Sequence, residues 1–172
     1  MTSESIFKVV VLLVFVSYPI YCCTCAFGKV KQKYCDAEWV SHAKIIDFEI
    51  VNGSDYYDSF PEVKDVKYKV EFKKIFKLSQ DLKDLNVTEL PTEVFTPADD
   101  SLCGIFLEKG QEYLLSGIYF NGTMSTNLCM QILFDDRQKS MENNILLWSE
   151  VPKNTSTGLQ AKEYEPCPKH VI

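Results

Sequence analysis

The 172-residue sequence predicts a single, mainly β domain, built as a small closed barrel with a short helix alongside and tied by disulfide bonds. Three observations predict this class. Residues 66–72 alternate between apolar and charged side chains, an Asn-Gly pair at 121–122 separates two apolar stretches, and seven cysteines lie along the chain. A chain of this length can bury one proper core and is too short for two ordinary domains. A β-sandwich is the alternative arrangement of such strands.

The first 22 residues have the order of a secretory signal peptide. One lysine, Lys8, precedes an unbroken apolar run at 9–16, which a serine and a proline then interrupt. The run is well short of the roughly 20 residues that a membrane-spanning helix needs. We therefore expect residues 1–22 to be removed and residues 23–172 to form the mature domain. The protein is then secreted to the extracellular space or extracellular matrix, without a membrane span.

The first strands are predicted from two segments. Residues 37–51 are apolar, with β-branched residues toward the end, which favours a short helical turn leading into a strand. In residues 66–72 the apolar side chains fall on one face and the charged ones on the other, as in a half-buried strand. The Asn-Gly pair at 121–122 has the chemistry of a tight hairpin turn between two further strands.

The remaining segments predict mostly irregular structure. Residues 78–101 are polar and interrupted by proline, which predicts a loop with a short strand around Val94. Beyond the hairpin we expect a short helix near 139–148, a break at Gly158 and an irregular Pro166-Cys167-Pro168 ending. Short strands that close on themselves beside a helix favour a barrel of the oligonucleotide/oligosaccharide-binding (OB) type.

The cysteine count helps to choose the cleavage site. Seven cysteines leave one unpaired in an oxidising compartment, but cleavage after Cys22 leaves six, whereas cleavage after Tyr21 leaves an odd number behind a bulky residue. Six cysteines allow 15 pairings, and the spacing does not choose among them. In the expected mature chain from Cys23, no C-x-x-C pair and no recognisable histidine spacing is present, so we expect disulfide bonds and no metal site or cofactor of the protein's own.

Charge and motifs exclude several classes of function. The net charge of -6 disfavours binding to nucleic acid or to an anionic membrane. No nucleophile elbow, zinc-protease motif, P-loop or dinucleotide fingerprint occurs, so we expect no enzyme activity. The lysines of 64–77 suit a solvated strand face better than a site for sulfated glycans, and His42 is read as a surface strand residue. We expect a monomer.

Candidate glycosylation sites agree with secretion. Each is an Asn-x-Ser/Thr acceptor, and the four are Asn52, Asn86, Asn121 and Asn154. One such tripeptide alone is weak evidence because it is short.

The segment around the predicted cleavage site carries a family resemblance. Cys23-Thr24-Cys25, followed by nine residues and Cys35, resembles the start of the N-terminal inhibitory domain of the tissue inhibitors of metalloproteinases. Further elements of that family follow in order: DAEWVSHAK (36–44), DDSLCG (99–104), EYLLSGIYFNGT (112–123), Trp148 and GLQAKEYEPC (158–167). The resemblance therefore covers nearly all of residues 23–167. The chain ends soon after Cys167, so we expect a form without the family's second domain.

The resemblance implies a fold and a set of disulfide bonds. The family fold is a five-stranded OB-fold barrel, the netrin-like module, with short flanking helices. The implied bonds join Cys23 to Cys103, Cys25 to Cys129, and Cys35 to Cys167.

The resemblance also implies a function, namely inhibition of extracellular zinc endopeptidases such as the matrix metalloproteinases. The α-amino and carbonyl groups of Cys23 would then bind the zinc of the target protease. Thr24 would enter its S1′ specificity pocket, with Cys25 and Ala26 continuing along the cleft. Ser101 and Leu102 would lie alongside as part of the inhibitory ridge.

The segment AFGKVKQKY (26–34) departs from the family pattern, because it lacks the usual prolines and the His-Pro-Gln sequence. The alternative function is therefore a netrin-like module that kept the barrel for adhesion or matrix interaction and inhibits nothing.

Overall fold

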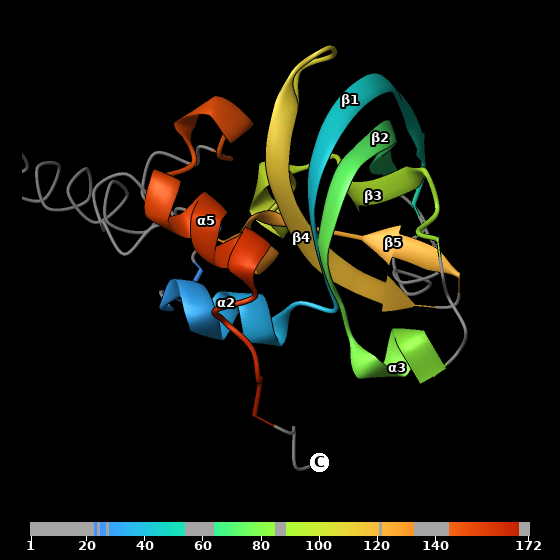
Figure 1. Ribbon diagram of the computed structural model, residues 1–172. Helices are drawn as coiled ribbons and strands as arrows, with labels where there is room; N and C mark the ends of the chain where they lie inside the picture. The colour runs from blue at the N-terminus through green and yellow to red at the C-terminus, as the bar shows by residue number, and fades with distance from the viewer. Residues whose placement is uncertain are drawn as a thin grey trace, which may run out of the picture.

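The strands close into a barrel. The computed structural model describes residues 23, 25–26, 28–53, 64–84, 89–120, 122–132 and 145–168. Within these residues, five strands follow the order β1-β2-β3-β5-β4 around the barrel (Figure 1): β1 (Trp39–Asn52), β2 (Lys64–Leu78), β3 (Glu93–Pro97), β4 (Glu112–Phe120) and β5 (Thr123–Ser125). This confirms the mainly β, OB-type barrel, and the sandwich alternative is wrong.

The helices flank this barrel. The α-helices of the described chain are α2 (Val30–Asp36), α3 (Gln80–Asp84) and α5 (Lys153–Ala161), and its 3₁₀ turns are η2 (Asp100–Leu102), η3 (Leu128–Met130) and η4 (Trp148–Glu150). Figure 1 shows α2 and α5 side by side against one side of the barrel, with α3 at the end of β2. None of the described helices is long and apolar enough to cross a membrane.

Strand pairing follows the predicted alternation. β1 pairs antiparallel with β2 along its whole length and with β4 at Trp39–Lys44, while the β3–β5 pair is parallel. Val66, Tyr68 and Val70 of β2 are buried, and the lysines between them face outward or are only half-buried. The predicted short strand around Val94 and the hairpin at 121–122 are confirmed as β3 and as the β4–β5 pair, with Gly122 at a φ of 84°.

Two apolar clusters form the core. One fills the barrel interior and includes Trp39, Leu115 and Met124, none of which has exposed area. The other lies between the outside of the barrel and the helices, with Tyr34 of α2 and Leu159 of α5 at its centre. Helices of this length are not stable alone in water, so the second cluster is what holds α2 and α5 in place.

Three expectations need correction. The segment 78–101 is not all loop around a short strand, because Gln80–Asp84 form α3. The helical turn expected within 37–51 lies earlier, because the buried side chain of Tyr34 anchors α2 and the chain from Trp39 onward is paired with β2 and β4. Gly158 does not break the chain but lies inside α5. A Cβ at Gly158 would lie 2.9 Å from the Tyr164 hydroxyl oxygen, so the glycine permits this close approach. The predicted signal peptide and most of the helix predicted near 139–148 lie outside the described residues.

Candidate functional site

Two chain segments meet at the predicted functional site, and we call them together the ridge: residues 23–26 and residues 99–103. A disulfide bond joins Cys23 of the first segment to Cys103 of the second. Ala26 and Ser101 are exposed, and Leu102 retains 36% of its accessible area. Thr24 lies outside the described residues. The ridge is thus covalently closed, with Ala26 and Ser101 on the surface.

A second disulfide bond packs against the first. It joins Cys25 to Cys129 in η3, and the Cys129 sulfur lies 3.5 Å from that of Cys103. All four sulfurs lie within 4.8 Å of one another, and Cys23, Cys25 and Cys103 pack against the interior cluster of the barrel. Each sulfur is in a disulfide, and a disulfide sulfur is no thiolate ligand for a metal.

The second ridge segment is held by its own backbone. The Asp99 carboxylate accepts a hydrogen bond from the Ser101 N–H at 2.8 Å, and η2 ends at Cys103 with a φ of 62°. A positive φ is uncommon for a residue other than glycine, and here the Cys103 N–H donates to the Asp100 carbonyl at 3.0 Å. Hydrogen bonds from the Ser101 side chain and backbone lower the pKa of the Asp99 carboxyl, so this cap is ionised at neutral pH.

Contacts from three elements fix the base of the ridge. The Leu128 N–H donates to the Cys103 carbonyl at 2.8 Å, and the Lys33 ammonium donates to the Cys129 carbonyl at 2.9 Å. The buried Gln131 amide nitrogen donates to the Ser116 and Asn127 carbonyls, each at 3.0 Å. Sequence reasoning missed these positioning residues, because a lone lysine or glutamine gives no signal of its partner.

The third disulfide bond serves the helical side of the molecule. It joins Cys35 of α2 to Cys167 in the C-terminal segment, where the rings of Tyr34 and Tyr164 approach to 5.5 Å. The three bonds join the same pairs that the family resemblance implies.

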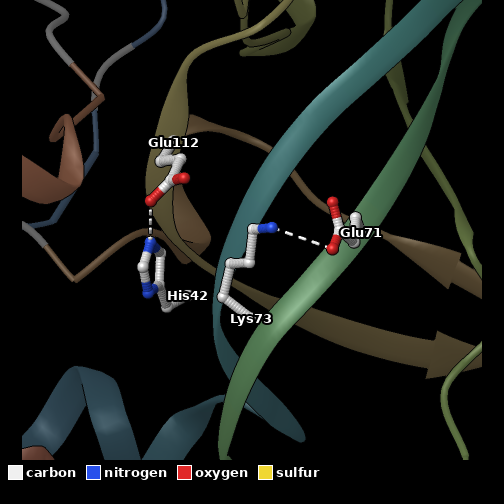
Figure 2. A network of polar contacts seen from close by, with 4 residues as sticks. All are labelled: His42, Glu71, Lys73 and Glu112. Carbon is white, nitrogen blue, oxygen red and sulfur yellow. Dashed lines mark hydrogen bonds and ion pairs between the residues drawn. The ribbon is translucent and has the colours of Figure 1, made fainter.

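His42 is more enclosed than a surface strand residue. Its side chain is 13% exposed, its Nε2 lies 2.6 Å from a Glu112 carboxylate oxygen, and its ring stacks on Trp148 at 4.1 Å between centroids. Figure 2 shows this pair beside the hydrogen bond from the Lys73 ammonium to Glu71, which measures 2.8 Å. The His42 contacts tie β1 to β4 and η4, which gives this histidine a structural role.

The predicted glycosylation sites divide into two groups. Asn52 at the end of β1 and Asn154 at the start of α5 are exposed, which is the placement that glycosylation needs. Asn86 and Asn121 lie outside the described residues.

Comparison with known proteins identifies the family. Residues 21–164 match the family described as tissue inhibitor of metalloproteinase. A Caenorhabditis elegans protein named "Putative metalloproteinase inhibitor tag-225" is 32% identical over 140 residues, which are 81% of this chain and 85% of that protein. Metalloproteinase inhibitor 4 of Rattus norvegicus is 34% identical over 113 residues, which are 64% of this chain and 47% of that protein. Metalloproteinase inhibitor 2 of Canis lupus familiaris is 29% identical over 139 residues, which are 78% of this chain and 59% of that protein. The chain thus spans about half the length of these two mammalian relatives. With its closed barrel and its disulfide-bonded ridge, the chain belongs to the tissue inhibitor of metalloproteinase family.

Proposed function

We propose that the mature protein begins at Cys23 and inhibits extracellular zinc metalloendopeptidases by occupying the open coordination position of their catalytic zinc. The observation that carries this proposal is the ridge itself. One disulfide bond joins Cys23, the first residue of the predicted mature chain, to Cys103, and an adjacent bond joins Cys25 to Cys129, with Ala26 and Ser101 exposed.

The chemistry of the first residue explains why cleavage before Cys23 matters. A catalytic zinc keeps one coordination position open for water or substrate. A free α-amino group has a pKa near about 8, so an appreciable fraction is neutral at physiological pH and can donate its lone pair. The nitrogen and the carbonyl oxygen of Cys23 would form a five-membered chelate ring with the zinc and displace the attacking water. Any preceding residue would turn the amine into an amide, which is a poor ligand.

The direction of the chain assigns the neighbouring contacts. With Cys23 at the zinc, Thr24 enters the S1′ pocket, and Cys25 and Ala26 continue on the primed side, where the substrate residues after the scissile bond would lie. Ser101 and Leu102 lie against the cleft beside them. Occupation of the zinc blocks the protease, so in this proposal the protein acts as an inhibitor and not as an enzyme.

Rigidity supplies the affinity in this proposal. Ordering a flexible side chain at an interface costs about 0.5–1.5 kcal/mol, and a ridge ordered before binding avoids most of that loss. The disulfide bonds and the Asp99 cap do this ordering in the free protein. A small contact surface can therefore bind tightly.

The experiment compares two secreted proteins whose N-termini are established by mass spectrometry. One begins at Cys23, and the other carries a single added alanine before it. Each is titrated against the catalytic domains of several matrix metalloproteinases with a fluorogenic peptide substrate. We expect near-stoichiometric inhibition by the first protein and none by the second. An added alanine at the C-terminus is the matched control and should change nothing.

A second variant tests the S1′ assignment. Thr24→Arg places a long cation in a pocket that the native residue fills with a small side chain, so the ranking of proteases by inhibition constant should change. If the authentic protein inhibits no member of the panel, the inhibitor proposal fails. The non-inhibitory netrin-like module for matrix interaction then becomes the better description.

A further inference from the structure

Three lysines follow the ridge along the chain. Lys29 is the N-cap residue of α2, and Lys31 and Lys33 lie in that helix. The Lys33 ammonium donates to the carbonyl of Cys129, the residue whose sulfur is bonded to Cys25. The start of α2 is therefore fixed relative to the ridge, and the positions of Lys29 and Lys31 are fixed with it.

Lys29 and Lys31 have no compensating charge, unlike Lys67 and Lys109. Lys67 lies 2.6 Å from Glu49 and 3.5 Å from Glu93, and Lys109 lies 2.9 Å from Asp47. Among the described residues, no carboxylate or carbonyl accepts a hydrogen bond or ion pair from the side chain of Lys29 or Lys31, and both residues are exposed. Their positive charge therefore faces solvent in a chain whose net charge is -6.

The second ridge segment begins with two carboxylates, whose charge is opposite to that of Lys29 and Lys31. Asp99 and Asp100 are both exposed, and the Ser101 hydrogen bonds lower the pKa of the Asp99 carboxyl. Lysines thus follow the first ridge segment along the chain, and two carboxylates begin the second.

We propose that Lys29 and Lys31 are specificity determinants that favour metalloproteinases with carboxylates beside the primed end of the cleft. The inference rests on the proposed function, in which Cys23 binds the zinc and the chain continues through Ala26 along the primed side of the protease cleft. Residues 29 and 31 come next in that direction. Charges at the rim of an interface act mainly on the association rate, because they steer the encounter before close contact forms.

The test measures association and dissociation rate constants. The probes are two matrix metalloproteinase catalytic domains, one with several carboxylates beside the primed end and one without. The variant is Lys29→Glu/Lys31→Glu. The matched control is Lys83→Glu/Lys153→Glu, which makes the same change of net charge at exposed lysines of α3 and α5.

With the protease that has carboxylates beside the primed end, at roughly 20 mM salt, we expect the Lys29→Glu/Lys31→Glu variant to associate about tenfold more slowly than the native protein. This difference should disappear at about 0.5 M salt. The dissociation rate should change less than about twofold. The control variant and the protease without the carboxylates should show no such difference.

Three results would overturn the inference. The Lys29→Glu/Lys31→Glu variant could associate as fast as the native protein, or the control variant could slow association equally, which would show an effect of net charge alone. Weaker retention of the Lys29→Glu/Lys31→Glu variant on immobilised heparin, with unchanged association rates, would assign the lysines to a sulfated glycan. These outcomes leave inhibition intact and so differ from failure of the proposed function, in which the native protein inhibits neither protease and both proposals fall.

Discussion

The barrel and the ridge are held together by different forces. The barrel interior is made of fully buried apolar side chains such as Trp39 and Leu115, and each Å² of apolar surface removed from water stabilises the fold by about 25 cal/mol. The ridge exposes Ala26 and Ser101 and relies on two disulfide bonds and a capped turn. Covalent bonds order a segment without burying it. The ridge can therefore be rigid while its surface stays free for a partner, and the barrel supplies the fixed base.

The largest expected effect comes from removing one bridge of the ridge and comparing it with the bridge on the helical side. Cys25→Ser/Cys129→Ser and Cys35→Ser/Cys167→Ser open loops of similar separation, 104 and 132 residues. Each should lower the free energy of unfolding by about 2–5 kcal/mol. Only the first should also weaken inhibition, by about 30- to 100-fold, because a loosened ridge must be ordered on binding.

Urea unfolding and inhibition constants of the folded variants measure the two effects separately. Circular dichroism first establishes that each variant has the native barrel. An equal loss of inhibition in both variants would mean that global stability, and not ridge order, sets the affinity.

Two glycines extend the comparison to backbone packing. A Cβ at Gly117 in β4 would collide with the Ser125 carbonyl and lie 2.6 Å from the Trp39 ring, whereas one at Gly104 would collide with the Pro97 carbonyl directly behind the ridge. Gly117→Ala should cost about 3 kcal/mol of stability, because it disturbs the packed interior of the barrel. Gly104→Ala should weaken inhibition more than it lowers stability.

The same pair of assays distinguishes these outcomes. If Gly104→Ala inhibits normally, then a shift in the backbone behind Cys103 does not reach the surface of the ridge. If Gly117→Ala is as stable as the native protein, the β4–β5 contact is looser than its geometry indicates.

Alkaline pH should lower the stability of the barrel through its buried tyrosines, whereas the ridge contains no tyrosine. Burial raises the pKa of Tyr68 and of Tyr113 above the ordinary value of 10.0. The unfolded chain releases these protons near pH 10 while the folded chain retains them. Their contribution to stability is therefore complete below pH 10.0 and is lost as the pH rises through the folded pKa.

Urea midpoints between about pH 8 and about pH 11 measure this loss. We expect a level midpoint that declines above pH 10, with a smaller decline in Tyr68→Phe. That variant should also lose about 1–3 kcal/mol at neutral pH, since the Leu107 N–H donates to the Tyr68 hydroxyl at 2.9 Å. An identical alkaline decline in both proteins would contradict the assignment to Tyr68.

Local sequence patterns were enough to predict most of the barrel. The alternation of residues 66–72 lies within β2, and Asn-Gly chemistry identified the β4–β5 turn, because both signals depend on neighbours in the chain. The helices were harder. α2 was placed too late and α5 was missed, because short helices such as these depend on tertiary packing, here around Tyr34 and Leu159.

The candidate site divides in the same way. Its cysteines are visible in the sequence, but spacing alone left 15 pairings open, and only the family resemblance implied the three that form. The contacts that order the ridge, such as Lys33 with the Cys129 carbonyl, join residues 96 positions apart. No local pattern encodes such a contact, since its partner is fixed by the fold.

The smallest expected effects come from two buried serines on neighbouring strands. Ser41 of β1 has no exposed area, and its hydroxyl has no hydrogen-bond partner among the described residues. Ser116 of β4 is equally buried, but its hydroxyl donates to the Met130 carbonyl at 2.7 Å, next to Cys129.

Ser41→Ala removes a desolvated polar group and should leave stability unchanged or raise it by about 1 kcal/mol, whereas Ser116→Ala should lower it by about 1 kcal/mol. Urea unfolding measures both, and a loss in Ser41→Ala would show that this hydroxyl has a bound partner such as water. Because Ser116 holds the chain that carries Cys129, its variant should also show a small loss of inhibition, which Ser41→Ala should not. A buried hydroxyl then matters for function only where it supports the ridge.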